Sequence, residues 1–114
     1  MNIIFRNSYG AIGHVNDSVN PECKLQLIVD TIGIYMSLAD LEYLLSVVEN
    51  TRASCLCEDC GNEFDKIVCK NARIDLHLKI NKGRLQLLEE LIKETLFNLE
   101  IVHTLKVNKI DLGL

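Results

Sequence analysis

The segment Cys55-Leu56-Cys57-Glu58-Asp59-Cys60-Gly61 lies at the middle of the 114-residue chain and separates two stretches with the same predicted order of elements. Each stretch holds two short strands joined by a turn and followed by an amphipathic helix. This order predicts an α+β fold of tandem ββα units (ββαββα), with a largely antiparallel sheet and two helices on one face. The length fits a single domain over residues 1–114, in which the two units share one core.

The first unit follows Cys23. Apolar residues alternate over 25–29 and 32–38, with Asp30-Thr31 as a two-residue connection, which predicts a hairpin with one buried face. Ser37 is the predicted N-cap of a helix, and Asp40 completes a capping box. Leucine and valine at helical spacing continue this helix to a predicted end at Asn50.

The second unit repeats the pattern after the cysteines. Ile67-Val68-Cys69 and residues 74–80 predict two strands around a turn at Asn71-Ala72, and Asn81 is the predicted N-cap of a helix that reaches Asn98. Glu89 precedes Lys93 by four residues, the spacing of a helical ion pair.

The two units predict an internal repeat of residues 21–50 and 58–98 around the thiol cluster at 55–60. Ile32 aligns with Ile74 at an offset of 42 residues and Leu41 with Leu85 at an offset of 44, a slip of two residues between strand and helix. Convergent ββα patterning without duplication is the alternative.

The two ends of the chain carry weaker patterns. Residues 3–5 and 9–15 predict one or two short strands around a turn, and residues 16–21, rich in Asn, Asp, Ser and Pro, predict a loop. After Asn98 the apolar residues fit a continued helix but also alternate as in a strand. Four β-branched residues between 101 and 107 favour a strand over 99–107.

The five cysteines predict a metal site rather than disulfides, because their number is odd and the N-terminal residues lack the pattern of a secretory signal. Cys57-Glu58-Asp59-Cys60-Gly61 has the spacing of a zinc knuckle, with two thiolates on a tight turn and a glycine that permits positive φ. Asn20-Pro21-Glu22-Cys23 looks like a second knuckle in which Asn replaces the first Cys.

We therefore predict a structural zinc held by Cys23, Cys57 and Cys60, with either Cys55 or His14 as the fourth ligand. Free thiols are one alternative. A thiol redox or metal-delivery protein that uses the CxCxxC cluster is another. Cys69 lies within a predicted strand and fits a small buried side chain.

No catalytic motif accompanies the thiols, so we predict a protein that is not an enzyme. The chain has no H-E-x-x-H motif, no phosphate-binding glycine loop, and no Ser or Cys adjacent to a His. His103 occupies an apolar-alternating position and fits a core histidine.

The sheet face away from the helices is a candidate interface, because it is partly apolar in the first unit. This face combines Ile28 and Tyr35 with Arg73, His77 and Lys79 of the second unit. We predict that it binds a protein partner or forms a homo-oligomer, such as a dimer. Basic residues between 66 and 84 leave a nucleic-acid contact as an alternative. The net charge of −4 and the pI near 5.3 argue against it.

No apolar run reaches the roughly 20 residues that cross a bilayer. The sequence therefore predicts a cytoplasmic protein without a membrane partner.

One part of the sequence resembles a known family. It runs from Gly13-His14-Val15 through Asn20-Pro21-Glu22-Cys23-Lys24-Leu25-Gln26-Leu27 to Ile34-Tyr35-Met36-Ser37-Leu38-Ala39-Asp40-Leu41. It resembles an uncharacterised family of small bacterial proteins in which a CxxC turn precedes a hairpin and a helix. The resemblance covers about residues 10–50 and implies an architecture but no activity, because that family is a domain of unknown function. Asn20 departs from the family pattern at the first Cys of the turn.

Overall fold

The structure, a computed structural model, describes residues 2–54, 65–71 and 74–107. The element order is β1 (Asn2–Arg6), β2 (Gly10–His14), β3 (Leu25–Val29), β4 (Ile32–Met36), α1 (Leu38–Ser54), β5 (Asp65–Lys70), β6 (Asp75–Ile80) and α2 (Lys82–Val107). The predicted α+β class and the ββα order of both units are confirmed.

The strands form two antiparallel sheets rather than one shared sheet. The first is a four-stranded meander in the order β1-β2-β3-β4, and the second is the β5-β6 hairpin. The N-terminal strands, not the second unit, extend the first hairpin, because β2 pairs along the whole of β3 from Gly10 opposite Val29 to His14 opposite Leu25. The sheet expected to span both units is therefore divided.

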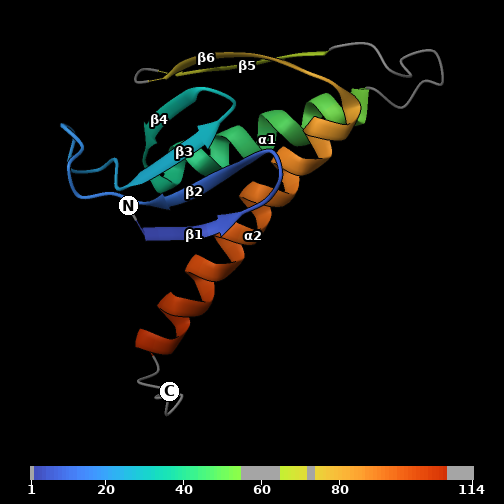
Figure 1. Ribbon diagram of the computed structural model, residues 1–114. Coiled ribbons are helices and arrows are strands. Elements are labelled where there is room, and N and C mark those ends of the chain that lie inside the picture. Colours follow the sequence, from blue (N-terminus) through green and yellow to red (C-terminus); the bar gives the residue numbers. More distant parts are fainter. Residues whose placement is uncertain (1, 55–64, 72–73, 108–114) are drawn as a thin grey trace.

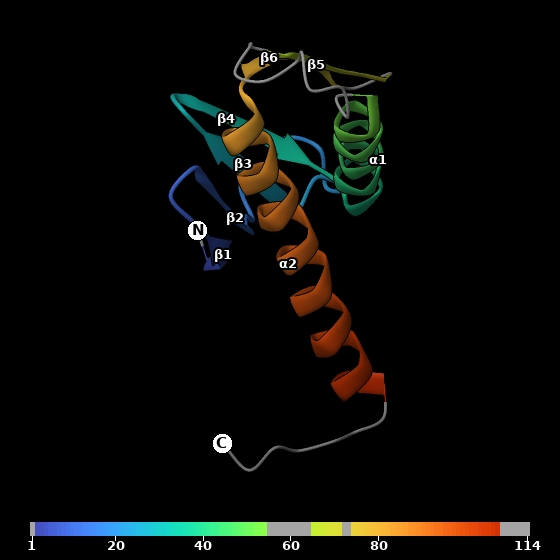
Figure 2. The ribbon, with the colours of Figure 1, turned by 90° about the vertical axis from the view of Figure 1, so that its right-hand side faces the viewer.

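Both helices lie on one side of the four-stranded sheet, and the β5-β6 hairpin lies across the top of α1 and the start of α2 (Figure 1). The view turned by 90° shows the C-terminal half of α2 continuing well past the sheet (Figure 2). α1 contacts α2, β5 and β4, whereas α2 contacts β1 and β2 as well as α1. The two helices therefore connect the two sheets.

One apolar core runs through both sheets and both helices. The alternation predicted for the second hairpin is confirmed, because every second residue of β6 is buried. The largest fully buried side chains come from all four parts of the fold: Ile12, Leu27, Met36, Leu41, Leu44, Ile67, Ile80, Leu88, Leu91 and Ile92. Burial of this apolar surface is the main force that holds the fold together.

Both predicted helix caps are confirmed. The Asp40 amide donates to Ser37 Oγ at 3.1 Å and the Ser37 amide donates to Asp40 Oδ2 at 3.0 Å, which closes the capping box of α1. The Arg84 amide donates to Asn81 Oδ1 at 2.8 Å at the start of α2. These bonds satisfy amides that have no partner inside a helix.

Asp40 also reaches the second unit. Its Oδ1 accepts a hydrogen bond of 2.9 Å from Asn71 Nδ2. Asn71 in turn accepts the Ile74 amide at its side-chain oxygen, at 2.8 Å, and donates its own amide to the Ile74 carbonyl. One carboxylate therefore links the first turn of α1 to the turn of the β5-β6 hairpin.

The hairpins of the two units correspond at an offset of 42 residues, since the pair Leu27–Ile34 has its counterpart in Cys69–Leu76, whereas the helices correspond at 44. The N-caps Ser37 and Asn81 lie 44 residues apart. Thr51 and Thr95 are separated by the same number of residues, and each hydroxyl donates to the carbonyl four residues earlier, at 2.8 and 2.7 Å. The strand register and the helix features therefore differ by the slip of two residues inferred from the sequence. The internal repeat itself stays a prediction.

The strand predicted over 99–107 is wrong, because α2 continues without a break from Lys82 to Val107. Leu96 and Leu99 keep the helical spacing and pack against the core. Asn98 lies inside the helix rather than at its end. Its side chain contacts β1, because Nδ2 donates to the Ile4 carbonyl at 3.5 Å. Tertiary contacts thus outweigh the β-propensity of the residues that follow.

α1 likewise runs past its predicted end at Asn50, to Ser54. Among the described residues, neither helix has the length and hydropathy that a membrane span requires.

Glu89 joins the two helices from a buried position. Its side chain is 8% exposed, and Oε1 accepts hydrogen bonds from Lys93 Nζ at 2.9 Å and from Arg52 of α1. The hydrogen bond from Lys93 lowers the pKa of Glu89, burial opposes this, and the charge of Arg52 adds to the lowering.

Gly10→Ala tests the close approach of β2 to β3. A Cβ atom at Gly10 would lie 2.2 Å from the Ile28 carbonyl oxygen and 2.8 Å from the Val29 side chain. The substitution must displace backbone, so we expect urea unfolding to show a loss of about 2 kcal/mol or more. Gly33→Ala is the matched control, because its Cβ comes closest to the flexible Gln26 amide and meets the Ile28 side chain only at ordinary contact distance, so it should change stability by less than about 1 kcal/mol. Equal losses would contradict the interpretation.

Glu89→Gln tests the ion pair between the helices. The pKa of Glu89 is lower in the folded than in the unfolded chain, so its stabilisation is present above the unfolded pKa and lost as the pH falls through the folded pKa. We expect a lower Tm for Glu89→Gln near neutral pH, and a difference from wild type that shrinks below about pH 4. Calorimetry measures both, with the exposed Glu94→Gln as control. A difference that does not depend on pH would exclude this role.

Candidate functional site

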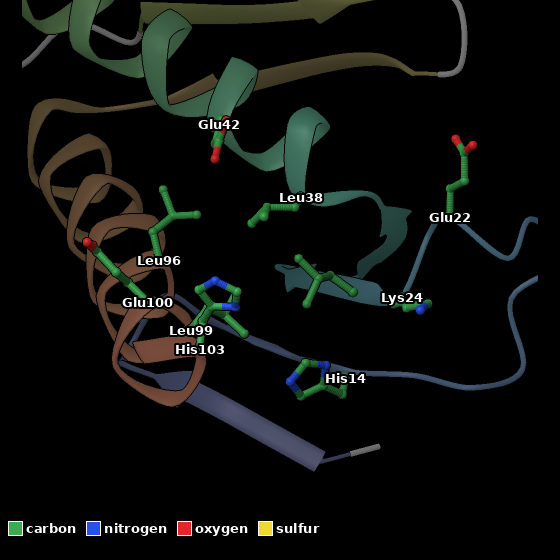
Figure 3. A pocket seen from close by; sticks show the side chains of 10 residues that line it. His14, Glu22, Lys24, Leu38, Glu42, Leu96, Leu99, Glu100 and His103 are labelled. Carbon is green, nitrogen blue, oxygen red and sulfur yellow. The ribbon is translucent and has the colours of Figure 1, made fainter. Parts of the chain in front are cut away.

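A groove of about 660 Å³ opens between the first turns of α1, the start of β3 and the C-terminal half of α2 (Figure 3). Four leucines form its apolar lining: Leu25, Leu38, Leu96 and Leu99. Six polar side chains complete the lining: His14, Glu22, Lys24, Glu42, Glu100 and His103. A mostly apolar groove with a few charged groups is a typical binding site.

The two helices supply matching residues to the groove. Leu38 and Glu42 lie one turn apart on α1, and Leu96 and Glu100 lie one turn apart on α2. The capping box fixes Leu38 as the first residue of α1. Its side chain is 49% exposed, although the sequence alternation assigned it to the buried face.

Two histidines reach the groove from different elements. His14 ends β2, opposite Leu25 of β3, and His103 lies on α2. The prediction that His103 is a core residue is wrong, because the continued helix leaves this position exposed on the groove side. Within residues 2–54, 65–71 and 74–107, no group of three or more His, Cys, Asp or Glu side chains could hold a metal ion.

The segment predicted as a degenerate knuckle forms a tight turn. The Cys23 amide donates to the Asn20 carbonyl at 3.0 Å, and the Glu22 amide donates to Asn20 Oδ1 at 3.0 Å. A side-chain oxygen that accepts the amide two residues later is an Asx turn, and the interpretation of this segment as a degenerate knuckle stays a prediction. The Cys23 thiol is free and buried.

The other predicted ligands Cys55, Cys57 and Cys60 lie outside the described residues. His14, Glu22 and Lys24 line the groove together with Leu38, the first residue of α1, and Cys23 lies between Glu22 and Lys24 in the chain. Ser54, which precedes the cysteines, ends that helix about 24 Å further along its axis. Cys57 is three residues beyond Ser54, and three residues span at most about 11 Å. A site confined to Cys55, Cys57 and Cys60 needs no such span, and the site that also includes Cys23 or His14 stays a prediction.

Cys69 is fully buried in β5, as expected for a small core side chain. Burial raises the pKa of its thiol, and the nearby charge of Asp40 raises it further. This environment favours the unreactive thiol form.

The predicted interface residues fall on two separate sheets. Ile28 and Tyr35 lie on the outer face of the four-stranded sheet, and Tyr35 is exposed. His77 and Lys79 are exposed on β6, where His77 Nε2 lies 2.7 Å from Asp75 Oδ1. Arg73 lies outside the described residues. The four described residues therefore do not share the single sheet face that the sequence predicted.

Sequence reasoning missed the groove. Leu99, Glu100 and His103 of its α2 wall lie in the stretch assigned to a strand. Leu38 of its α1 wall was assigned to the buried face. The helical spacing of Leu96, Leu99 and His103 was the signal that could have placed them on one side of a helix.

The geometry makes a prediction about zinc. If zinc binds only at the thiol cluster, zinc-loaded protein in native mass spectrometry should keep its metal stoichiometry in Cys23→Ala, because the length of α1 separates its start, near which Cys23 lies, from Ser54, which precedes the cluster. Cys57→Ser is the control, since it removes a ligand of any site in the thiol cluster. Loss of one zinc in Cys23→Ala, with the fold intact by circular dichroism, would refute the distance argument.

The sequence matches no protein-family model, no curated protein and no solved structure. The resemblance to a family of small bacterial proteins of unknown function therefore stays a prediction, and function is inferred from the geometry of this chain.

Proposed function

We propose that this chain is a non-enzymatic protein-binding module, and that it associates with a second copy through the open edge of β4. The observation that carries the proposal is that β4 ends the four-stranded sheet without a neighbouring strand among the described residues. An open edge can pair with a strand of another chain, and its backbone groups then supply the hydrogen bonds.

The composition of β4 favours pairing. The strand Ile32-Gly33-Ile34-Tyr35-Met36 holds no charge and no proline, and its pairing with β3 is regular over all five residues. A two-residue loop places Val29 and Ile32 in a hydrogen-bonded pair, so the backbone groups of Gly33 and Tyr35 point away from β3. These groups are the donors and acceptors that a new strand would use.

The opposite edge is different. β1 carries Arg6, and its register with β2 shifts between Ile3 and Phe5. A bulge and a charge are the features by which proteins protect an edge from pairing. The sheet thus has one protected edge and one open edge, as expected if β4 alone is used for association.

The outer sheet face beside β4 adds apolar surface. Tyr35 lies opposite Gln26, and Gly33 lies opposite Ile28, which is partly exposed. A symmetric pair of β4 strands would bring Tyr35 and Ile28 of both copies onto one continuous sheet face. Of the interface residues predicted from the sequence, this proposal keeps Ile28 and Tyr35 of the first unit.

The remaining expectations concern other parts of the chain. A structural zinc, or the alternative redox and metal-delivery roles, would use cysteines outside the described residues. The nucleic-acid alternative would use the exposed His77 and Lys79, where His77 already interacts with Asp75. Neither receives the support that the edge geometry gives to protein binding.

Tyr35→Asp tests the proposal. A charge at this edge position should weaken self-association about tenfold or more, because two like charges meet near the symmetry axis. Sedimentation velocity over a range of protein concentrations measures the effect. Tyr43→Asp is a matched control, because Tyr43 on α1 is 43% exposed and Tyr35 is 41% exposed. A wild-type protein that stays monomeric, or equal effects of the two variants, would reject the proposal.

A further inference from the structure

The β5-β6 hairpin has an open strand edge of its own. Among the described residues, β6 pairs only with β5, and the two strands form a separate sheet. Figure 1 shows this hairpin across the top of α1, apart from the four-stranded sheet. Every second residue of β6 is buried, which fixes one face of the strand on the core. The alternate residues are exposed: Asp75, His77 and Lys79.

The pairing with β5 determines which backbone groups of β6 face the open edge. At the hairpin turn, the Asn71 amide donates to the Ile74 carbonyl at 2.8 Å, so these two residues form a hydrogen-bonded pair. Hydrogen-bonded and non-hydrogen-bonded pairs alternate along an antiparallel ladder. The pairs that contain Asp75, His77 and Lys79 are therefore the non-hydrogen-bonded ones. The amides and carbonyls of these three residues point away from β5, toward the open edge.

The charges along this edge are complementary to themselves. Asp75 and Lys79 lie two residues on either side of His77. If two β6 strands pair in antiparallel orientation around His77, each Asp75 lies opposite the Lys79 of the other copy. This register also uses the outward backbone groups of all three residues. A shift of two residues in either direction leaves one end of each strand without a partner and separates Asp75 from Lys79.

The other open edges lack this pattern. The corresponding positions of β5 are Lys66, Val68 and Lys70, so a symmetric pair of β5 strands would place lysine opposite lysine. β4 holds no charge, so it offers no counter-charge to β6. Charged residues at a strand edge oppose pairing with most strands. The edge of β6 therefore favours a strand with the reverse order of charges, and a second copy of β6 has that order.

The hairpin also contains a like-charge register that this pairing offsets. Lys66 of β5 is the ladder partner of Lys79, and like charges at opposite positions destabilise a strand pair. In the symmetric pair, Asp75 of the second copy lies on the other side of Lys79. The second copy thus supplies a carboxylate where the single hairpin places two lysines.

We infer that the open edge of β6 pairs with β6 of a second copy around His77, with Asp75 opposite Lys79 in both directions. The contact joins two hairpins into one sheet in the order β5-β6-β6-β5. It lies in a different sheet from the β4 edge, goes beyond the contact proposed there and does not depend on it. A protein that uses both edges assembles beyond the dimer, because two different symmetric contacts on one molecule extend an assembly.

The test is made in the Tyr35→Asp background, in which the β4 contact is weakened, so that the remaining self-association reports on another surface. Sedimentation velocity at protein concentrations up to about 1 mM is the measurement, because a contact between single strand edges is small and weak. We expect Tyr35→Asp to form a dimer that dissociates on dilution. A Tyr35→Asp protein that stays monomeric at every concentration would overturn the inference, whatever the result at the β4 edge.

Reversing one charge should break the contact. In this background, Asp75→Lys places lysine opposite lysine, and Lys79→Asp places aspartate opposite aspartate. Each variant should therefore associate about tenfold more weakly or worse. Both positions are exposed, so circular dichroism should show an intact fold. Glu94→Lys is the matched control, because it makes the same change in charge as Asp75→Lys at an exposed position of α2 and should associate as the background does.

Reversing both charges should restore the contact. The double variant Asp75→Lys/Lys79→Asp has the net charge of the background and again places opposite charges across the two-fold axis, so we expect the dimer to return. An equimolar mixture of the two single variants should also form a dimer, although neither does so alone. Loss of association in the single variants without recovery in the double variant would overturn the inference, because the two charges would then not face each other.

Discussion

The buried carboxylate of Asp40 holds together parts of the chain that have no strand pairing in common. The residue is 2% exposed, and its two oxygens accept the Ser37 amide and the Asn71 side chain. A buried charge is tolerated only where such partners are fixed. The carboxylate therefore sets the start of α1 and the position of the β5-β6 turn together, and the two units are joined although their sheets are separate.

The capping box of Ser37 and Asp40 also determines where the groove and the unpaired strand edge lie. Because the capping box fixes the first turn of α1, Leu38 and Glu42 face the distal half of α2, and the groove results. β4 ends immediately before this turn, with its outer edge unpaired. One short stretch of chain thus borders both candidate surfaces, while the opposite edge of the sheet is protected by the bulge in β1 and by Arg6.

Local signals in the sequence predicted local structure well. Ser37 with Asp40, Asn81, and the alternation over 74–80 each act within a few residues, and each has the expected geometry. The failures depend on distant contacts. Residues 99–107 are helical because Leu99 packs on the core and Asn98 contacts Ile4, and the same continuation exposes His103. The pairing of β2 with β3 requires the close approach at Gly10. The spacing of the cysteines in the sequence does not show that α1 lies between Cys23 and Cys57.

The contact between Asn98 and Ile4 has a consequence for the order of folding. It joins residues 94 positions apart, and Asn7 likewise donates to the Leu87 carbonyl across 80 positions. Closing so long a loop costs conformational entropy that only a nearly complete structure can offset. We therefore expect the N-terminal hairpin to dock on α2 late in folding.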